Sequence, residues 1–280
     1  MTSADPRITP ARPDLAASFL KGKIEAARFT EGTKMRVAAS VLDLRTSSER
    51  NTPLDTQLLH GEVFTVFETR PDGLVWGQSE RDEYVGYVDA TGLSEVTQKP
   101  NTQVSALLTH VYDKPDMKTK PLSQLPFLSL LHTEETTNNF TRFGDEKFCP
   151  VQHLSPLEPI ETDFVKVAER FLGAPYLWGG RTMLGVDCSG LVQVALQAVG
   201  ERPPRDSDMQ AELGETIDGG AKLVRGDLVL WNGHIGIMRD KETLLHANAH
   251  AMAVTSEPLS VVVERIRANG YGGITACRRL

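Results

Sequence analysis

The sequence contains few cysteines and no long apolar run. Its three cysteines, Cys149, Cys188 and Cys277, are far apart and form no Cys-x-x-Cys pair, which argues against a disulfide framework and suits a reducing compartment. No apolar stretch reaches the roughly 18 residues that a membrane-spanning helix needs. The first thirty residues also lack an apolar segment of signal-peptide length. We therefore expect a cytoplasmic protein.

Positive charge is also in the minority. The 280 residues carry 30 lysines and arginines against 37 aspartates and glutamates, which gives a net charge of -7. Such a protein is poorly suited to a nucleic-acid backbone or to an anionic membrane surface, so we expect neither as a partner. The apolar fraction of 40% is ordinary, and the length allows two or three domains with a sizeable core.

The most distinctive stretch of the chain is a glycine-rich segment that leads into a cysteine. It contains Asp187-Cys-Ser-Gly190, after which the pattern turns helical. The apolar face of this helix consists of Cys188, Leu191, Val192, Ala195 and Val199. Cys188 then lies in the first turn, where unpaired N–H groups and the helix dipole favour an anion. We therefore expect a lowered thiol pKa and a reactive nucleophile, with a buried, inert cysteine as the alternative.

The C-terminal part of the sequence, residues 162–280, predicts an α+β domain. Thr162-Asp163 caps a helix, Gly173 ends it, and Pro175 prevents its continuation. After the Cys188 helix the sequence is rich in β-forming residues. The strands that we expect are Asp227–Trp231, Ile235–Met238, Leu244–Ala247, Val261–Ile266 and Ile274–Arg278. This order of elements is typical of helices packed on an antiparallel sheet.

The N-terminal part predicts two small all-β barrels. Residues 35–98 contain short β-rich runs separated by turn residues, and residues 101–157 repeat this theme more weakly. The expected strands are Val37–Leu44, Glu62–Glu68, Leu74–Ser79 and Tyr84–Val88 in the first barrel, and Val104–Tyr112, Phe127–Leu131, Phe140–Phe143 and Phe148–Val151 in the second. Residues 1–34 form a polar leader, in which residues 15–29 suggest a short docking helix.

Three of the seven histidines share the C-terminal half with Cys188, namely His234, His246 and His250. A cysteine nucleophile needs a base within reach and a third group that orients the base. If the hairpin that follows His234 centres near Asp240, His234 and His246 face each other with Cβ atoms about 4.5–5.5 Å apart. His250 is then a structural or rim residue, with orientation of the base as its alternative role. A zinc site formed by Cys188 and these histidines is a further alternative.

Together these motifs resemble one known family, the NlpC-type cysteine peptidases, which are papain-like and cleave stem peptides of bacterial peptidoglycan. The motifs stand in family order and are Tyr176-Leu-Trp-Gly-Gly, Asp187-Cys-Ser-Gly-Leu, Pro204-Arg-Asp-Ser, Gly226-Asp-Leu-Val, Gly233-His-Ile-Gly-Ile and Leu244-Leu-His246. The resemblance covers residues 162–280. The preceding barrels are similar to the bacterial SH3-like domains of one branch, the γ-D-glutamyl-L-diamino-acid endopeptidases that act on free murein peptides.

The resemblance implies catalytic roles for four side chains. Cys188 resembles the nucleophile, His234 the base and His246 the third member of the triad. Tyr176 resembles the residue that lines the oxyanion side together with the backbone N–H of Cys188, with an ordinary core tyrosine as the alternative. Trp178 resembles a wall of the substrate pocket, with plain packing as its alternative.

The same branch recognises the free amine of an N-terminal L-alanine. Asp187 and Ser189, which flank the nucleophile, resemble acceptors for this ammonium group, and helix capping is the alternative role of Asp187. The motif formed by Arg205, Asp206 and Ser207 resembles the border of the same pocket, with a solvated turn as the alternative.

In that branch the first barrel is thought to close the pocket. Glu49, in the long first loop of the barrel, and Tyr84, before its last strand, resemble the side chains that contribute to it. The alternatives for Glu49 are pairing with Arg45 and plain solvation.

The resemblance therefore implies a cysteine endopeptidase without metal or other cofactor. It would hydrolyse the bond between γ-D-glutamate and a diamino acid, diaminopimelate or lysine, in free murein peptides with an unblocked N-terminal L-Ala, as part of cell-wall peptide recycling. The alternatives are a non-catalytic peptidoglycan-binding protein and a Cys–His amidase or acyltransferase with another substrate. The complete set of Cys188, His234 and His246 favours an enzyme.

Overall fold

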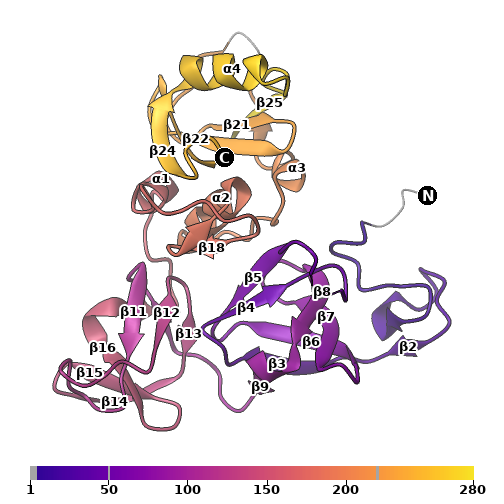
Figure 1. The fold of residues 1–280 in the computed structure, drawn as a ribbon, viewed down its shortest axis with the longest axis vertical. Helices are drawn as coiled ribbons and strands as arrows, with labels where there is room; N and C mark the ends of the chain where they lie inside the picture. Colours follow the sequence, from indigo (N-terminus) through magenta and orange to yellow (C-terminus); the bar gives the residue numbers. More distant parts are fainter. Residues whose placement is uncertain (1–4, 50, 219–220) are drawn as a thin grey trace. The chain divides into compact units, whose positions relative to one another are not determined.

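The structure is a computed structural model that describes residues 5–49, 51–218 and 221–280. The chain divides into two units, Met1–Leu157 and Glu158–Leu280, which can be followed by their colours in Figure 1. Unit 1 consists of strands with a few three-residue 3-10 helices, whereas unit 2 combines α-helices with a six-stranded sheet. This is the predicted α+β class. Among the described residues, no helix combines the length and the apolar character needed to cross a bilayer.

The first barrel of unit 1 contains a five-stranded sheet of order β8-β7-β6-β3-β9 and the hairpin β4–β5. Its strands are β3 (Thr33–Val37), β4 (Val41–Leu44), β5 (Thr56–Leu59), β6 (Val63–Thr69), β7 (Leu74–Ser79), β8 (Val85–Asp89) and β9 (Leu93–Glu95). Alternate residues point inward, so that Leu42 and Leu44 join Phe64 and Val88 in the buried core. The single strand predicted over residues 37–44 is in fact two strands, β3 and β4, separated by a bend.

The second barrel of unit 1 is built from shorter strands in three small sheets, of order β13-β10-β17, β11-β12 and β14-β15-β16. They are β10 (Thr102–Val104), β11 (Leu108–Val111), β12 (Ser123–Pro126), β13 (Leu130–Leu131), β14 (Thr133–Thr137), β15 (Phe140–Phe143), β16 (Lys147–Pro150) and β17 (Leu154–Pro156). Cys149 is fully buried in the core beside Val111 and Phe143, and burial raises the pKa of its thiol to about 12. This cysteine is therefore a packing residue.

The leader does not form the helix suggested for residues 15–29. It contains two very short strands, β1 (Ala16–Ala17) and β2 (Phe29–Thr30), which pair in parallel. Gly22 has a φ of +80°, a left-handed conformation that interrupts a helix. The leader nevertheless docks on the first barrel, because Leu15 is fully buried in a cluster with Trp76 and Val85.

Unit 2 is organised around an antiparallel sheet of order β20-β25-β21-β22-β23-β24. Its strands are β20 (Glu215–Thr216), β21 (Leu228–Trp231), β22 (His234–Met238), β23 (Thr243–Asn248), β24 (Ala253–Pro258) and β25 (Ala276–Arg279). The remaining elements are α1 (Phe164–Glu169), the hairpin β18 (Arg181–Thr182) and β19 (Gly185–Val186), α2 (Cys188–Ala198), α3 (Ser207–Gln210) and α4 (Leu259–Ala268). The predicted cap of the first helix is confirmed, because the Asp163 carboxylate accepts hydrogen bonds from the N–H groups of Val165 and Lys166.

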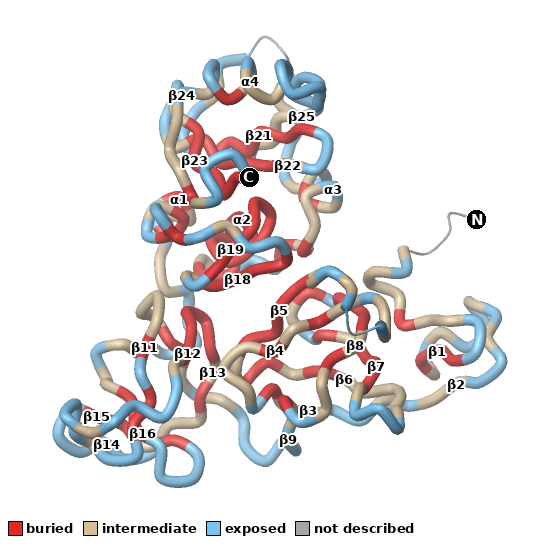
Figure 2. Tube along the Cα trace, viewed as in Figure 1, coloured by how far each residue is buried: buried red, intermediate tan, exposed pale blue. Residues whose placement is uncertain are grey.

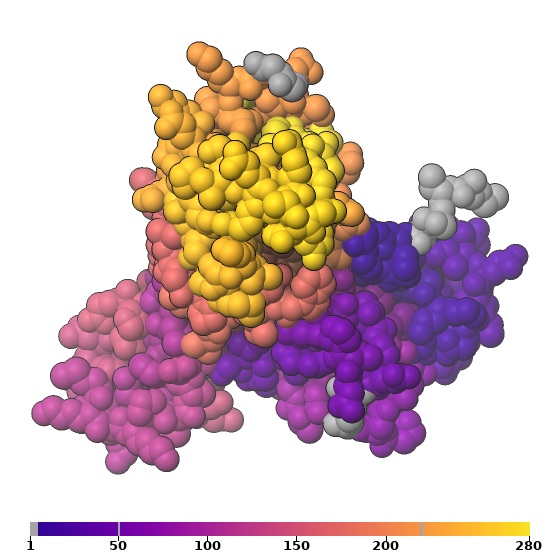
Figure 3. All heavy atoms as spheres, turned by 45° about the horizontal axis from the view of Figure 1, so that its top comes forward, coloured from indigo at the N-terminus to yellow at the C-terminus, as the bar shows by residue number. Residues whose placement is uncertain are grey.

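Helices cover both faces of this sheet. α2 is buried along its whole length (Figure 2) and lies against β22 and β23. α4 lies on the other side of the sheet (Figure 1), where Val262 packs against Val229, Trp231 and Leu244. The outer surface of α4, within the yellow C-terminal segment, faces solvent in Figure 3. The strands between these helices are therefore held from both sides.

The strand predicted over residues 261–266 is wrong, because these residues belong to α4. Three consecutive valines at 261–263 favour a strand locally. However, Leu259, Val262, Val263 and Ile266 are spaced as one face of a helix, and all four contribute to the cluster on the sheet. Burial of this face outweighs the local preference.

The two barrels of unit 1 meet at Gly61. The N–H of Leu130 donates to the carbonyl oxygen of His60 at 2.8 Å. Gly61 has a φ of +84°, and a Cβ built there would overlap the carbonyl oxygen of Leu130. Gly73 has the same φ of +84° but open space around it. Backbone conformation alone favours glycine at position 73, whereas position 61 requires it for packing as well.

We predict that Gly61→Ala lowers the free energy of unfolding more than the matched change Gly73→Ala. Both variants place an L-residue in the left-handed region, at a cost of about 1–2 kcal/mol. Only Gly61→Ala must also displace the Leu130 backbone, which we expect to add about 1–3 kcal/mol. Urea denaturation of the two variants measures the difference. Equal destabilisation would show that the contact between the barrels contributes nothing to the free energy of unfolding.

Candidate active site

The candidate nucleophile, Cys188, begins α2. Asp187 is the N-cap of this helix, and its carboxylate accepts a hydrogen bond from the N–H of Gly190 at 2.6 Å. The helix therefore starts as predicted, with Cys188 in its first turn. The cysteine is 7% exposed. Its sulfur accepts a hydrogen bond from the backbone N–H of Ile235, the residue after His234, which brings the sulfur next to the start of β22.

Burial decides the ionisation of this thiol. It raises the pKa of Cys188 to about 12, and the charge of Asp187 adds to the rise. The N–H groups of Ile235 and Ser189 and the cation of Arg205 act in the opposite direction but are outweighed. The predicted lowering of the thiol pKa is therefore wrong for the resting site. A helix terminus does favour an anion, but removing a thiolate from water costs more.

Two imidazoles meet in the same part of unit 2, and one of them belongs to His234, the residue before Ile235. The Nε2 atom of His234 is 2.8 Å from the Nδ1 atom of His246, and the ring planes are inclined at 63°. His246 is 1% exposed, so the contact is shielded from water. The predicted meeting of these two side chains is confirmed.

The strand register that produces this contact differs from the predicted one. Ile237 pairs with Leu245 and Met238 with Leu244, which is a shift of two residues along β22. Because side chains alternate between the faces of a sheet with a period of two, this shift leaves both histidines on one face. They are diagonal neighbours instead of directly opposed ones, a separation that long side chains can bridge.

A carboxylate that the sequence analysis did not identify lies behind His246. The Oε1 atom of Glu257, on β24, is 3.1 Å from the Nε2 atom of His246. Arg265, on α4, donates to both carboxylate oxygens of Glu257 at 2.6 and 2.9 Å. Neither residue was expected here, because β24 was not predicted and α4 was predicted as a strand. The usable signal was the β-forming pair Val254-Thr255, which favours a strand next to that of His246.

Burial also keeps the two imidazoles neutral. It lowers the pKa of His234 to about 3, and repulsion from His246 and Arg265 contributes. Burial likewise lowers the pKa of His246, against the opposing effect of Glu257. Near pH 7 the thiol and the imidazoles are therefore all uncharged, and charge arises only when a proton passes from sulfur to nitrogen.

A cleft of about 560 Å³ in unit 2 is lined by both histidines and by Tyr176 and Trp178 from the loop before α2. Burial raises the pKa of the Tyr176 phenol, and the sulfur of Cys188 contributes to the rise, which places this hydroxyl close to the nucleophile. A protonated phenol can donate a hydrogen bond to a developing oxyanion. Trp178 is 61% exposed, as expected of a wall of the cleft.

His250 also lines this cleft and is exposed. Because His234 is already bound to His246, the geometry favours His246 as the orienting residue. His250 therefore takes the rim position predicted for it.

A buried ion pair lies next to the cysteine. Arg205, which is 1% exposed, donates to the two carboxylate oxygens of Asp187 at 3.0 and 2.6 Å and to the Ser189 hydroxyl at 2.8 Å. Asp187 thus caps α2, which was its alternative role, and also neutralises a buried guanidinium. Arg205 is thus buried against the turn that carries the nucleophile, and its place at the border of the substrate pocket stays a prediction.

The two remaining candidates of this motif lie where α3 begins. Asp206 occupies the N-cap position of α3 without a capping bond from its side chain, and Ser207 is the first helical residue. Both are half-buried. α3 is fixed to the nucleophile turn because the Gln210 amide donates to the backbone oxygen of Ser189 at 3.0 Å.

The geometry does not support the zinc alternative. The Nε2 atom of His234 and the Nδ1 atom of His246 bind each other, and the second nitrogen of His246 faces Glu257. Three of the four ring nitrogens of these two histidines are therefore engaged. Over residues 5–49, 51–218 and 221–280, no group of three or more His, Cys, Asp or Glu side chains is placed to hold a metal ion.

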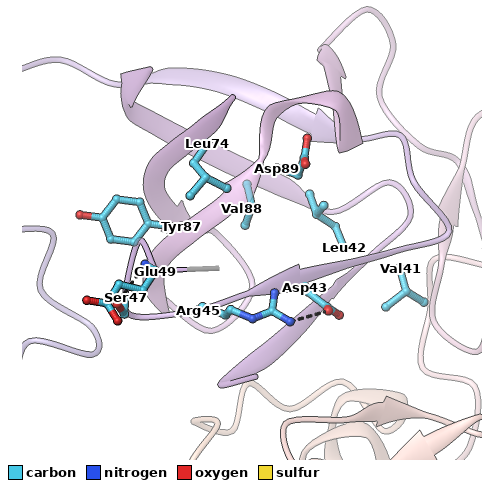
Figure 4. A pocket seen from close by; sticks show the side chains of 10 residues that line it. All are labelled: Val41, Leu42, Asp43, Arg45, Ser47, Glu49, Leu74, Tyr87, Val88 and Asp89. Atoms are coloured by element: carbon cyan, nitrogen blue, oxygen red, sulfur yellow. Dashed lines mark hydrogen bonds and ion pairs between the residues drawn. The ribbon is translucent and has the colours of Figure 1, made fainter. Parts of the chain in front are cut away.

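The two candidates from the first barrel lie in unit 1. Tyr84 is 3% exposed and belongs to the barrel core. Glu49 is exposed and lines a pocket of about 420 Å³ in the barrel, shown in Figure 4. In the same pocket Arg45 pairs with Asp43 at 3.0 Å. A contribution of Glu49 and Tyr84 to the pocket around Cys188 stays a prediction.

Two family models match the chain. The model of the bacterial dipeptidyl-peptidase SH3 domain matches residues 44–93, and the model of the NlpC/P60 family matches residues 173–267. The first match covers most of the first barrel. The second covers the cysteine, both histidines, Glu257 and Arg265.

Curated relatives are similar to more than half of the chain. A gamma-D-glutamyl-L-lysine dipeptidyl-peptidase of Bacillus cereus is 30% identical over 205 residues, which are 64% of this chain and 60% of the relative. A protein of the same name from Bacillus subtilis is 28% identical over 177 residues, 59% of this chain and 60% of the relative. The chain thus spans about 60% of the length of these two relatives.

The fold also matches a crystal structure. An NlpC/P60 family protein from Bacillus cereus superposes with a TM-score of 0.72 at 20% identity, over 88% of this chain and 99% of that one. The likeness extends through the barrels and the α+β domain, since it covers most of both chains. The motifs and the two family models agree: the chain carries an NlpC/P60 domain over residues 173–267, preceded by a bacterial SH3 domain over residues 44–93.

Proposed function

We propose that this protein is a cysteine endopeptidase that hydrolyses the γ-D-glutamyl–diamino acid bond of free murein peptides with an unblocked N-terminal L-Ala. The observation that carries the proposal is the 2.8 Å contact between His234 and His246, next to Ile235, whose N–H binds the buried sulfur of Cys188. The activity for which the two Bacillus relatives are named, that of a gamma-D-glutamyl-L-lysine dipeptidyl-peptidase, supports the bond and the peptide class.

The reaction is acyl transfer through a thioester. His234 accepts the thiol proton as the Cys188 sulfur attacks the γ-glutamyl carbonyl carbon. The resulting oxyanion is stabilised by the backbone N–H of Cys188 and the Tyr176 hydroxyl. His234 then returns the proton to the amine of the departing diamino acid, and the thioester remains.

Hydrolysis of the thioester uses the same imidazole. His234 takes a proton from water, the hydroxide attacks the acyl carbon, and the proton passes to the Cys188 sulfur as it leaves. The dipeptide L-Ala-γ-D-Glu is released and the neutral thiol is restored. Because thiol and imidazole start uncharged, the opposite charges appear together and stabilise each other.

Recognition of the free amine requires an acceptor of negative charge. The charge of Asp187 is matched by Arg205, so we assign to Asp187 and Arg205 the task of holding Ser189 in place. Following the family resemblance, Ser189, Asp206 and Ser207 then contribute to the amine site, and Trp178 forms a wall of the cleft. We include Glu49 and Tyr84 of the first barrel in this proposal.

The proposed setting is peptide recycling in the cytoplasm. All three cysteines are free thiols, the usual state in a reducing compartment. Peptides that have been released from the cell wall and imported carry free amines, which is the form of substrate that the proposal requires.

The decisive experiment is an assay on a panel of defined peptides. We expect wild type to release the free diamino acid from L-Ala-γ-D-Glu-diaminopimelate or from its lysine analogue, as detected by mass spectrometry, and Cys188→Ala to release none. Acetylation of the N-terminal amine should abolish turnover, because the ammonium charge is lost. Equal cleavage of acetylated and free peptides would refute the proposed specificity, and absence of cleavage throughout would refute the activity.

The orienting role of His246 gives a second prediction. We expect His246→Ala to lower kcat by about 10³–10⁴-fold, as loss of the third member does in related triads, with a small change in KM. The matched control is His110→Ala, which removes an exposed imidazole on β11 and should leave the kinetic constants unchanged. Steady-state kinetics that show similar activity for both variants would contradict the triad.

The raised pKa of Cys188 predicts how the thiol responds to pH. Alkylation by iodoacetamide requires the thiolate, so its rate at Cys188 should be low near pH 7 and rise about tenfold per pH unit toward the pKa of about 12. The rate is measured by mass spectrometry of the peptide that contains Cys188. A rate that is already constant between pH 6 and 8 would instead demonstrate a preformed thiolate–imidazolium pair.

A further inference from the structure

Glu257 terminates a chain of contacts that starts at His234, the residue before Ile235, whose N–H binds the Cys188 sulfur. The carboxylate touches His246, and His246 touches His234. Glu257 and His246 both project from the α4 side of the sheet, since the strand partner of His246 is Thr255, two residues before Glu257. The inference developed here depends on the proposed peptidase activity and concerns what Glu257 does for it.

An ionised carboxylate only accepts hydrogen bonds. Arg265 holds the pKa of Glu257 down to about 2, so the carboxylate is ionised at every pH at which the protein would work. The 3.1 Å contact with the Nε2 atom of His246 is therefore a hydrogen bond only if that nitrogen carries the proton. A neutral imidazole has one N–H, so the Nδ1 atom of His246 must be an acceptor.

The protonated nitrogen of His234 follows in the same way. Since the Nδ1 atom of His246 accepts, the Nε2 atom of His234 at 2.8 Å must donate. The one proton of neutral His234 is then on Nε2, and its Nδ1 atom carries the free lone pair. This is the nitrogen left to take the thiol proton of Cys188.

A second polar group near His246 does not change which of its ring nitrogens donates and which accepts. The side-chain amide of Asn248 lies 3.3 Å from the Nε2 atom of His246, but its two N–H groups have other acceptors, the Thr255 hydroxyl at 2.7 Å and the Ala253 carbonyl oxygen at 3.4 Å. Thr255 in turn donates to Glu257 at 2.9 Å. Asn248 therefore has acceptors other than His246, and the hydrogen bond of Thr255 is directed toward the carboxylate.

The charge of Glu257 also compensates for burial. Burial lowers the pKa of both histidines, which makes a buried imidazole a weak proton acceptor. At His246 the carboxylate of Glu257 raises the pKa against this effect of burial. The two bonds from Arg265 keep the carboxylate in position and ionised.

We propose that Glu257, held by Arg265, is a positioning residue of this peptidase. Its carboxylate sets the tautomer of His246, and through it the tautomer of His234, so that a lone pair faces the Cys188 sulfur. Glu257 touches neither the sulfur nor the substrate carbonyl and acts through His246.

The test is Glu257→Gln, which keeps the shape but removes the compulsory acceptor. The amide oxygen will face Arg265, so its NH₂ group will face His246 and donate to the Nε2 atom. Both imidazoles then hold their protons on Nδ1, and the lone pair of His234 points away from Cys188. We expect kcat on the tripeptide to fall about a hundredfold with KM changed less than about twofold. The matched control is Glu264→Gln, an exposed site on α4, which should retain wild-type kinetics.

A measurement without substrate separates this proposal from the proposed activity. In ¹⁵N-histidine-labelled wild type, long-range ¹H–¹⁵N spectra should show His234 and His246 as neutral tautomers protonated on Nε2. In Glu257→Gln both should shift to the tautomer protonated on Nδ1. Assignment uses His234→Gln and His246→Gln.

Failure of the role of Glu257 and failure of the proposed activity give different results. Protonation of His246 on Nδ1 in wild type, or unchanged kcat and tautomers in Glu257→Gln, would overturn the role of Glu257 even if the peptide is cleaved. An inactive wild type with the expected tautomers would instead overturn the substrate proposal and leave the role of Glu257 standing.

Discussion

The hydrogen bond between His234 and His246 depends on almost every other feature of unit 2. It joins two adjacent strands, so it exists only in a register that keeps both side chains on one face. That register is held because both faces of the sheet are covered, by α2 on one side and by α4 on the other. The same covering removes water from the sulfur and the imidazoles. The contact and the dry environment that gives it strength thus have one structural cause.

Charge in this site is arranged around a neutral centre. Cys188, His234 and His246 are uncharged at rest because burial penalises each charged form. On one side of them Asp187 pairs with Arg205, and on the other Glu257 pairs with Arg265. Each carboxylate has its own arginine, which offsets part of its charge. The only charge separation left to the site is the transfer of the thiol proton to His234.

Local sequence patterns predicted the parts of the site that depend on local structure. The start of α2 at Cys188 follows from a cap residue and an apolar face of helical period, and the structure has both. The convergence of His234 and His246 was also predictable, although the register was displaced by two residues. The prediction survived because a shift by an even number preserves the face, whereas a shift by one residue would have separated the histidines.

The features that the sequence did not reveal depend on packing between distant segments. The helix-terminus rule predicted a low thiol pKa, but the rule does not include desolvation, which is set by the whole fold. The missed pair of Glu257 and Arg265 has the same origin as the wrong strand at residues 261–266. A strand there would have projected Arg265 on the face shared by Val261 and Val263. In the helix, Arg265 flanks the buried stripe formed by Val262 and Ile266 and reaches across to Glu257. The burial that selects a helix over a local strand preference is therefore also what brings the arginine to the relay.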